Sequence, residues 1–313
     1  MQKKLLHTKL LTWYKKEGRH DLPWRNTSDV YHIYISEVML QQTQVKRVLE
    51  EYYFQFLDRF PSLDLLSKAS LDEVFALWSG LGYYRRAANL HKTAQLCAPA
   101  LPKVHKELLK LPGIGRYTAS AICSFGYRQS IAVVDTNIAR VLSRLLSLKD
   151  PKEKLLWEKA QELLHPTKSR SYNLALMDLG AMICLPKKPL CTMCPLSDLC
   201  KAKENPEFFT KVQAKEYEDK TLYFGIYIQE GQIALSKSKE GMYKEMLTLP
   251  SIELKDSAYI GCIKHSVTKY RLKVHLYELE EQPPFCEFFP LSSLKDAPIS
   301  SMTKKALALY FKK

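Results

Sequence analysis

Apolar residues recur at helical spacing through most of the chain. Near the N-terminus a helix is predicted, because its apolar side chains fall on one face, at Leu6, Leu10, Trp13 and Tyr14. Residues 36–45, SEVMLQQTQV, are predicted to open another helix, with an apolar stripe at Val38, Val45, Val48, Leu49, Tyr52 and Phe56. A further stripe follows Asp135, at Ile138, Val141, Leu142 and Leu145. Residues 1–210 are therefore predicted to be mainly helical.

The pattern changes after a polar, lysine-rich stretch at about 201–220. TLYFGIYI, a turn at Glu230 and Gly231, and QIALS predict a β-hairpin, and RLKVHLYEL alternates like another strand. SMTKKALALYFKK looks like a closing helix. We therefore predict two domains: a mainly α domain over residues 1–210, and a small α+β domain over residues 221–313.

Charge is unevenly distributed along the 313 residues. The net charge is +14, of which residues 221–313 carry +3 and residues 1–220 carry +11. Such an excess indicates a polyanionic partner, most simply nucleic acid, although an acidic membrane would also fit.

No apolar run approaches ~18 residues, and His7 and Lys9 interrupt the N-terminal segment, which excludes a signal-peptide core. We expect a soluble monomer, cytoplasmic and associated with a bacterial nucleoid, with reduced thiols and no membrane partner.

Four cysteines fall together in CLPKKPLCTMCPLSDLC, at Cys184, Cys191, Cys194 and Cys200. Four thiolates suit either zinc or an iron–sulfur cluster. Zinc knuckles usually pair two CxxC hairpins, whereas here one CxxC is flanked by single cysteines, which favours a [4Fe–4S] cluster. Its role is either structural, shaping a phosphate-binding loop, or electron transfer, and we favour the first. The other cysteines are interpreted as buried small apolar residues, at Cys97, Cys123, Cys262 and Cys286.

The stretch LPGIGRYTASAI, residues 111–122, predicts a helix, a tight hairpin and a second helix. Gly113 and Gly115 leave backbone amides uncovered, and outward-pointing amides before a helix can bind a phosphate. A plain helix connector that binds nothing is the alternative interpretation.

Two carboxyl groups, Glu37 and Asp135, are candidates for chemistry. Each has a simpler explanation: Glu37 is placed in the first turn of its predicted helix, where the dipole favours it, and Asp135 stands where an N-cap belongs. Together they fit cleavage of a bond to an anomeric carbon, since one carboxyl can protonate the leaving group while the other supports the cationic sugar. Their spacing does not establish that they meet.

Several motifs resemble the helix-hairpin-helix DNA glycosylases, and within them the adenine-specific MutY branch. The resemblance covers nearly all of residues 1–210 and implies a helix-hairpin-helix glycosylase fold of two helical lobes with a [4Fe–4S] loop. The motifs are LPWR at 22–25, SEVMLQQTQV at 36–45, LWSGLGYYRRAANLHKTA at 77–94, LPGIGRYTASAI at 111–122, VVDTN at 133–137, MDLGAMIC at 177–184 and the four-cysteine loop.

The resemblance implies an enzyme of base excision repair that binds double-stranded DNA. It would extrude an adenine mispaired with 8-oxoguanine or guanine and hydrolyse its N-glycosidic bond.

Roles follow from the resemblance by position. Glu37 would protonate the purine, Asp135 would stabilise the cationic sugar or its covalent adduct, and Asn137 and Tyr117 would assist them. Lyase-type relatives such as endonuclease III carry a Schiff-base lysine where this chain has Tyr117. A phenol cannot form that adduct, so the resemblance implies a monofunctional glycosylase that leaves an abasic site.

The resemblance also implies contacts with DNA. Gly113 and Gly115 would hold the DNA backbone, and Gln42, Leu81 and Tyr83 would wedge into the duplex and hold the partner base. The simpler explanations for these last three residues are that they belong to a solvated helix face or make a contact in the core.

Two positions depart from the family pattern. The family usually has glycine at Thr136, and it often has glutamine or glutamate, which can touch the adenine, at Leu174. Leucine cannot make that hydrogen bond. Together with Tyr117, these departures resemble the related thymine mismatch glycosylases, so excision of thymine opposite guanine is one alternative. A non-catalytic iron–sulfur protein that binds DNA or transfers electrons is another.

The second domain weakly resembles a Nudix-like domain that recognises the base opposite adenine. It lacks the acidic box that hydrolysis needs, so recognition without a second activity is predicted. Where the family has a Phe-Ser-His loop, this chain has Val267, Thr268 and Lys269. Thr268 keeps a hydroxyl and Lys269 a possible phosphate contact, but the aromatic is gone, which predicts weaker discrimination of 8-oxoguanine from guanine.

Overall fold

The computed structural model describes residues 2–209, 216–238, 243, 246–253, 258–267, 269–294 and 297–312. Contacts divide the chain into two compact units, residues 1–45 with 96–213 and residues 46–95 with 214–313. The predicted division into residues 1–210 and 221–313 stays a prediction. No helix in these described ranges has both the length and the apolar character needed to span a membrane.

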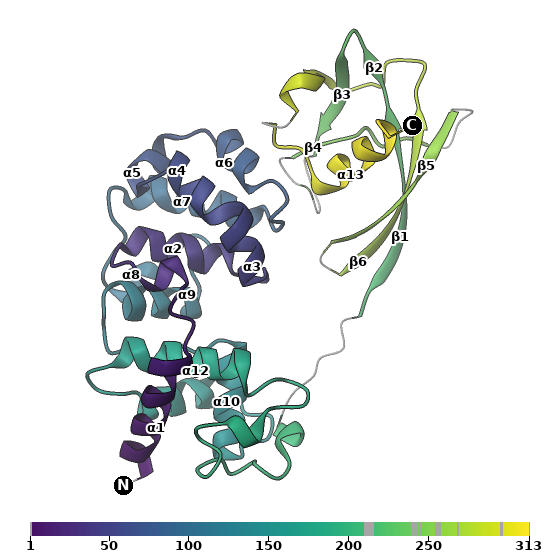
Figure 1. Ribbon diagram of the computed structural model, residues 1–313. Helices are drawn as coiled ribbons and strands as arrows, with labels where there is room; N and C mark the ends of the chain where they lie inside the picture. The colour runs from purple at the N-terminus through teal and green to yellow at the C-terminus, as the bar shows by residue number, and fades with distance from the viewer. Residues whose placement is uncertain are drawn as a thin grey trace. The chain divides into compact units, whose positions relative to one another are not determined.

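Helices build the first unit. Their bounds are α1 (Gln2–Glu17), α2 (Val30–Met39), α8 (His105–Leu108), α9 (Arg116–Ala121), α10 (Thr136–Leu146), α11 (Glu153–Leu163) and α12 (Ser169–Met182). The predicted N-terminal helix is confirmed, and it buries Leu6, Leu10 and Tyr14. α12 packs against both α1 and α10 (Figure 1). The buried faces of these helices form one apolar core.

The predicted helix opening at residue 36 is wrong in its bounds. α2 begins after Asp29, whose carboxylate accepts a hydrogen bond from Tyr31 N, and ends at Met39. Glu37 therefore lies in the last turn of α2, where the helix dipole disfavours a carboxylate, and the dipole explanation for Glu37 fails. The chain then turns through Gln42, at φ +57°, before a separate helical run begins at Val45.

The predicted helix–hairpin–helix is confirmed between α8 and α9, and α9 continues as a π-helix over Ile122–Gly126. Gly113 has φ +73°, a left-handed conformation that suits glycine. Ile114 is buried between the two exposed glycines. One apolar side chain thus anchors a turn whose backbone faces solvent.

The second unit begins with helices. These are α3 (Val45–Arg47), whose first residue belongs to the first unit, a π-helix (Val48–Tyr52), α4 (Tyr53–Arg59), α5 (Leu63–Lys68), α6 (Leu71–Trp78) and most of α7 (Arg85–Cys97). Ser70 and Glu73 form a reciprocal capping box at the start of α6. Edge-to-face contacts of Phe56 with Phe60 and Trp78 centre the apolar core of these helices.

Strands and one helix complete the second unit. They are β1 (Glu218–Ile226), β2 (Ile228–Gln229), β3 (Gln232–Lys237), β4 (Leu247–Thr248), β5 (Ala258–Val267), β6 (Tyr270–Glu278), β7 (Glu287–Pro290) and α13 (Ser301–Tyr310). One sheet has the order β1-β6-β5, and the other has the order β2-β3-β4 with β7 also paired to β3. The closing helix is confirmed as α13, which contacts β5.

The predicted hairpin over residues 221–236 is only partly correct. β2 and β3 pair antiparallel around Glu230 and Gly231, which both have positive φ. β1, however, leaves this hairpin and pairs in parallel with β6. An alternating pattern identifies a strand but does not identify its partner, so this parallel pairing could not be predicted from the pattern.

Candidate active site

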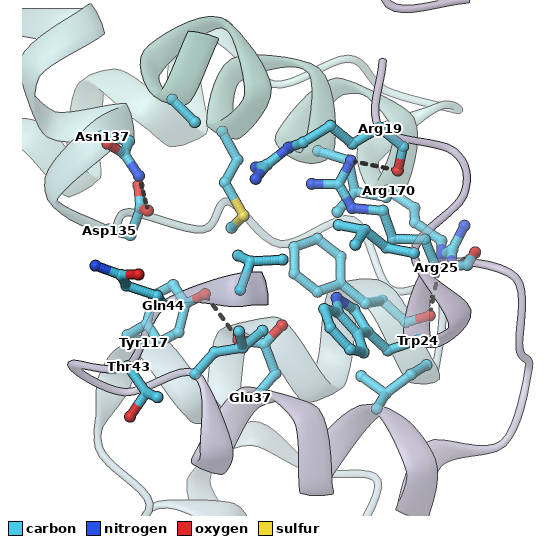
Figure 2. Close-up of a pocket in the computed structure, with 18 residues that line it drawn as sticks. Arg19, Trp24, Arg25, Glu37, Thr43, Gln44, Tyr117, Asp135, Asn137 and Arg170 are labelled. Carbon is cyan, nitrogen blue, oxygen red and sulfur yellow. Dashed lines mark hydrogen bonds between the residues drawn. The ribbon is translucent and has the colours of Figure 1, made fainter. Parts of the chain in front are cut away.

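One cavity of about 310 Å³ in the first unit brings together the residues predicted to carry chemistry. Glu37 comes from the end of α2, Tyr117 from α9, and Asp135 and Asn137 from the start of α10 (Figure 2). The two carboxyl groups, 98 positions apart in the sequence, therefore line the same space.

Glu37 is held by a single phenol. The Tyr117 hydroxyl donates a hydrogen bond of 2.7 Å to Glu37 Oε2 (Figure 2). Only 6% of Glu37 is exposed, and burial raises its pKa to about 7, with a further upward contribution from the negative charge of Asp135. The phenol and Arg25 act in the opposite direction. At neutral pH this carboxyl can therefore both hold and release a proton.

Asp135 is the N-cap of α10, as predicted. Its Oδ1 accepts from Ile138 N at 2.7 Å, and its Oδ2 accepts from Asn137 Nδ2 at 3.0 Å. Burial raises the pKa of Asp135, whereas both of these donors and the charge of Arg140 oppose the rise. Capping thus fixes the carboxylate in the wall of the cavity and does not exclude a chemical role.

Three arginines that sequence reasoning missed also line the cavity: Arg19, Arg25 and Arg170. Arg25 makes two hydrogen bonds to Asp178, of 2.6 and 2.8 Å, and Arg19 adds bonds from its backbone N and its Nε. Arg170 Nη2 donates to the backbone carbonyl of Arg25 at 2.6 Å. Arg25 lies within the LPWR motif and Asp178 within the MDLG motif. The sequence therefore marked both stretches, but it did not indicate that Arg25 and Asp178 form an ion pair.

Leu174 forms part of the apolar wall of the cavity, with Ile33 and Met177. Polar side chains that the sequence did not single out, Thr43 and Gln44, line the same cavity (Figure 2). No pattern in the sequence distinguished these two from the surrounding polar residues of the loop after α2.

A groove of about 790 Å³ shares Glu37, Tyr117 and Asp135 with the cavity. Its other walls include Gly113 and Gly115 of the hairpin, together with Gln42 and Thr136. The groove thus places the hairpin backbone beside the two carboxyl groups.

The remaining predicted contact residues lie in the second unit, and their roles stay predictions. Leu81 is 4% exposed and Tyr83 is 40% exposed. Val267 ends β5, and Lys269 forms an ion pair with Glu218. Thr268 lies outside the described residues.

The four predicted cluster cysteines all line a second cavity, together with Arg144. Arg144 Nη1 donates to Cys184 Sγ at 3.3 Å and to the carbonyl of Leu185 at 2.7 Å. Within the described ranges, no group of three or more His, Cys, Asp or Glu side chains that could hold a metal ion is found. The four cysteines thus line one small cavity of about 30 Å³.

Arg140 connects this cysteine loop to the active site. Its Nε donates to the backbone carbonyl of Cys184 at 2.7 Å, and its Nη2 donates to Asn137 Oδ1 at 2.9 Å. Because Asn137 in turn donates to Asp135, the loop and the carboxylate belong to one hydrogen-bond network.

Comparisons with known proteins agree with this architecture. Residues 35–166 match the family described as HhH-GPD superfamily base excision DNA repair protein. The chain is 39% identical over 274 residues to an adenine DNA glycosylase of Buchnera aphidicola subsp. Baizongia pistaciae, covering 84% of this chain and 78% of that one.

Two solved structures are also similar. A thermostable thymine-DNA glycosylase is 32% identical, with a TM-score of 0.61 over 65% of this chain and 97% of that one. A non-covalent endonuclease III–DNA complex is 19% identical with a TM-score of 0.56, covering 65% of this chain and 97% of that one, a likeness of fold alone.

Fold and site together define a base excision DNA repair protein of the HhH-GPD superfamily, with a helical glycosylase domain followed by a small β-rich C-terminal region. The predicted helical helix-hairpin-helix glycosylase domain and the small β-rich region after it are confirmed, whereas the iron–sulfur loop and the Nudix-like likeness stay predictions. Within that superfamily, the chain belongs to the adenine DNA glycosylase family.

Proposed function

We propose that this protein is a monofunctional glycosylase that removes adenine opposite 8-oxoguanine or guanine in duplex DNA. The observation that carries the proposal is a buried, protonatable Glu37 in the same cavity as the capped carboxylate of Asp135. Two carboxyl groups in different environments are what cleavage of a glycosidic bond needs.

Each carboxyl has its own step. Tyr117 occupies Glu37 Oε2, so Oε1 is the oxygen left to pass its proton to the purine ring. Protonation lets the bond between C1′ and N9 break with its electrons going to the base, which leaves positive charge on the sugar. Asp135, held by Asn137 and the Ile138 amide, faces that charge as a carboxylate. Water then adds to C1′ and gives the abasic site, and the proton that this water loses returns to the Glu37 carboxylate.

Tyr117 limits the reaction to hydrolysis. It lies beside Glu37, where a lysine amine would be needed to form a Schiff base with C1′ and cleave the strand. A phenol has no amine for that bond, so strand breakage is expected only after alkali.

Excision of thymine opposite guanine is the second candidate. It is supported by Leu174, which offers the base an apolar wall, and by the 32% identity to a thymine-DNA glycosylase. Adenine is favoured because the 39% identity to an adenine DNA glycosylase extends over 84% of this chain.

The cysteine loop is proposed to hold a [4Fe–4S] cluster through Cys184, Cys191, Cys194 and Cys200. These residues fit the group because four thiols converge on one cavity beside the buried guanidinium of Arg144, which can offset the negative charge of a thiolate cluster. When bound, the cluster would supply structural cross-linking. Arg140 and Arg144 of α10 donate hydrogen bonds to the backbone carbonyls of Cys184 and Leu185 in this loop.

The C-terminal region is proposed to recognise the base opposite adenine, without hydrolysis of its own. Val267 and Lys269 flank the turn between β5 and β6, in place of an aromatic wedge and a histidine. Discrimination between 8-oxoguanine and guanine is therefore proposed to be weak.

Single-turnover excision tests the proposal on duplexes that contain adenine opposite 8-oxoguanine, adenine opposite guanine, and thymine opposite guanine. Each reaction is read with and without hot alkali. Release of adenine, with breakage only after alkali, is the expected result. Release of thymine alone would support the thymine glycosylase that Leu174 suggests. Release of no base from any duplex by iron-loaded protein would favour a protein that binds DNA without catalysis. Breakage without alkali would contradict the role of Tyr117.

A further inference from the structure

The loop between α6 and α7 has an unusual backbone. Three of its residues lie in the left-handed region: Gly80 at φ +98°, Gly82 at φ +79° and Tyr83 at φ +52°. Tyrosine rarely adopts this conformation, so the surrounding structure must hold it there. The result is an exposed phenol ring at Tyr83 beside a buried Leu81.

Arg86, in the first turn of α7, holds this loop from within. Its Nη2 donates to the carbonyl of Gly82 at 3.0 Å and to that of Leu81 at 3.3 Å. Its guanidinium also lies 5.4 Å from the ring centroids of both Trp78 and Tyr83. One side chain thus contacts the backbone and the exposed ring of the same loop.

Neighbouring groups complete the support. Trp78 Nε1 donates to the carbonyl of Gly82 at 3.0 Å, and the amide of Gly80 donates to the Tyr84 hydroxyl at 3.1 Å. Tyr52 approaches so closely that a Cβ on Gly80 would meet its hydroxyl at 2.5 Å. Burial lowers the pKa of Arg86 to about 10, which leaves it charged at neutral pH.

We infer that Arg86 is a positioning residue for the reaction: it holds the loop of residues 80–83 in its left-handed conformation, so that the Tyr83 ring is presented to the duplex in the orientation needed to part the bases. This inference rests on the proposed function and on the predicted role of Tyr83 as a residue that wedges into the duplex. Arg86 acts through Tyr83 and does not touch the reacting atoms.

The neighbouring Arg85 provides a matched control. It is also an arginine of the first turn of α7 but is exposed. Arg86→Ala and Arg85→Ala each remove one positive charge, so a difference between them cannot be due to general attraction of DNA.

The test measures two quantities on each variant bound to a duplex with adenine opposite 8-oxoguanine. One is the single-turnover excision rate. The other is the fluorescence of a 2-aminopurine beside the mismatch, which rises when stacking is lost. A second duplex carries the adenine as an unpaired bulge, which is already partly unstacked and needs less wedging.

Arg86→Ala is expected to lower excision from the mismatch by about tenfold or more and to remove the fluorescence rise, while excision from the bulge falls by less than about threefold. Arg85→Ala is expected to stay within about twofold on both duplexes. Equal behaviour of the two variants, or equal loss on mismatch and bulge, would overturn the inference.

A double-variant cycle separates positioning from general damage to the fold. Adding Arg86→Ala to Tyr83→Ala is expected to cause little further loss, because both act through the same ring. Additive losses would show that Arg86 acts independently of Tyr83. If Arg86→Ala does not fold, Arg86→Lys serves, since it keeps the charge but not the planar guanidinium.

The outcome also separates this inference from the proposed function. Absence of excision by the unaltered protein on every duplex would refute the proposed function, and the fluorescence rise would still report on Arg86. Normal excision by the unaltered protein with equal Arg85 and Arg86 variants would refute the inference alone.

Discussion

Two buried carboxyl groups of the first unit have pKa values that are shifted in opposite directions. Glu37 is 6% exposed and receives one hydrogen bond from the Tyr117 phenol, and its pKa is raised to about 7. Asp178 is fully buried, yet its pKa is lowered, because the bonds and charges of Arg25 and Arg19 outweigh the effect of burial.

The difference shows that burial alone does not decide the state of a carboxyl group. Burial pushes both groups toward the protonated form, and the partner determines the result. Two guanidiniums keep Asp178 as an anion that braces the arginines of the cavity wall. A neutral phenol leaves Glu37 able to exchange a proton. The cavity therefore combines a structural anion with a group suited to acid catalysis.

Replacing Glu37, the proposed acid, should produce the largest effect on the excision rate. In Glu37→Gln the side chain keeps its size but has no proton to give the base. Loss of a general acid typically costs about 10²- to 10⁴-fold in rate. We expect single-turnover excision to fall by that range or more while mismatch binding, measured by anisotropy, stays close to normal. Excision that persists within tenfold would exclude Glu37 as the acid.

The same variant provides a stability control. Because the folded pKa of Glu37 is about 7 and the ordinary value is 4.5, its favourable contribution to folding is lost as pH rises from about 4.5 to 7. Glu37→Gln removes this loss and should raise the free energy of unfolding above pH 7, by about 3 kcal/mol. Urea unfolding at pH 5 and pH 8 measures this free energy. The difference in unfolding free energy between Glu37→Gln and the unaltered protein should be larger at pH 8 than at pH 5.

Breaking the other carboxyl site should damage the fold. Arg25→Met leaves Asp178 buried with fewer donors, which is expected to cost about 3–5 kcal/mol of unfolding free energy. The surface ion pair between Lys9 and Asp198 is the matched control, since Lys9→Met should cost less than about 1 kcal/mol. Urea unfolding compares the two variants. Similar losses would mean that burial of Asp178 adds nothing to the worth of its ion pair.

The contrast between these sites was only partly predictable from the sequence. The N-cap role of Asp135 followed from its place before an apolar stripe, and the structure agrees. Glu37 was assigned to the wrong end of its helix, although the Asp29 cap in NTSD was a usable signal for the true start. Local patterns indicate helix ends and caps because those depend on neighbouring residues.

Pairs formed across the chain could not be predicted in the same way. Asp178 meets Arg25 from 153 positions away, and Glu37 meets Tyr117 from 80 positions away. Neither spacing carries a periodic signal, so the protonation states of Asp178 and Glu37 depend on tertiary packing. The parallel pairing of β1 with β6 could not be predicted from the sequence for the same reason.

The pH profile should expose Glu37 as the acid. Because Glu37 is proposed to act in its protonated form and its pKa is raised to about 7, excision should be constant at lower pH and fall about tenfold per unit above pH 7. Single-turnover rates between pH 5.5 and 9, with anisotropy to confirm saturated binding, measure this limb. A flat profile up to pH 9 would contradict proton donation by this carboxyl.

Removing the Tyr117 phenol should have the smallest effect on the excision rate, but it should shift the pH dependence of that rate in a defined direction. The hydrogen bond from Tyr117 lowers the pKa of Glu37, so in Tyr117→Phe that pKa should rise and the alkaline limb should move to higher pH, by up to about one unit. Below pH 7 the rate should change by less than about tenfold. Tyr172→Phe is the control, because that buried hydroxyl has no hydrogen-bond partner within the described residues. A limb that moved to lower pH in Tyr117→Phe would mean that the phenol stabilises the protonated acid.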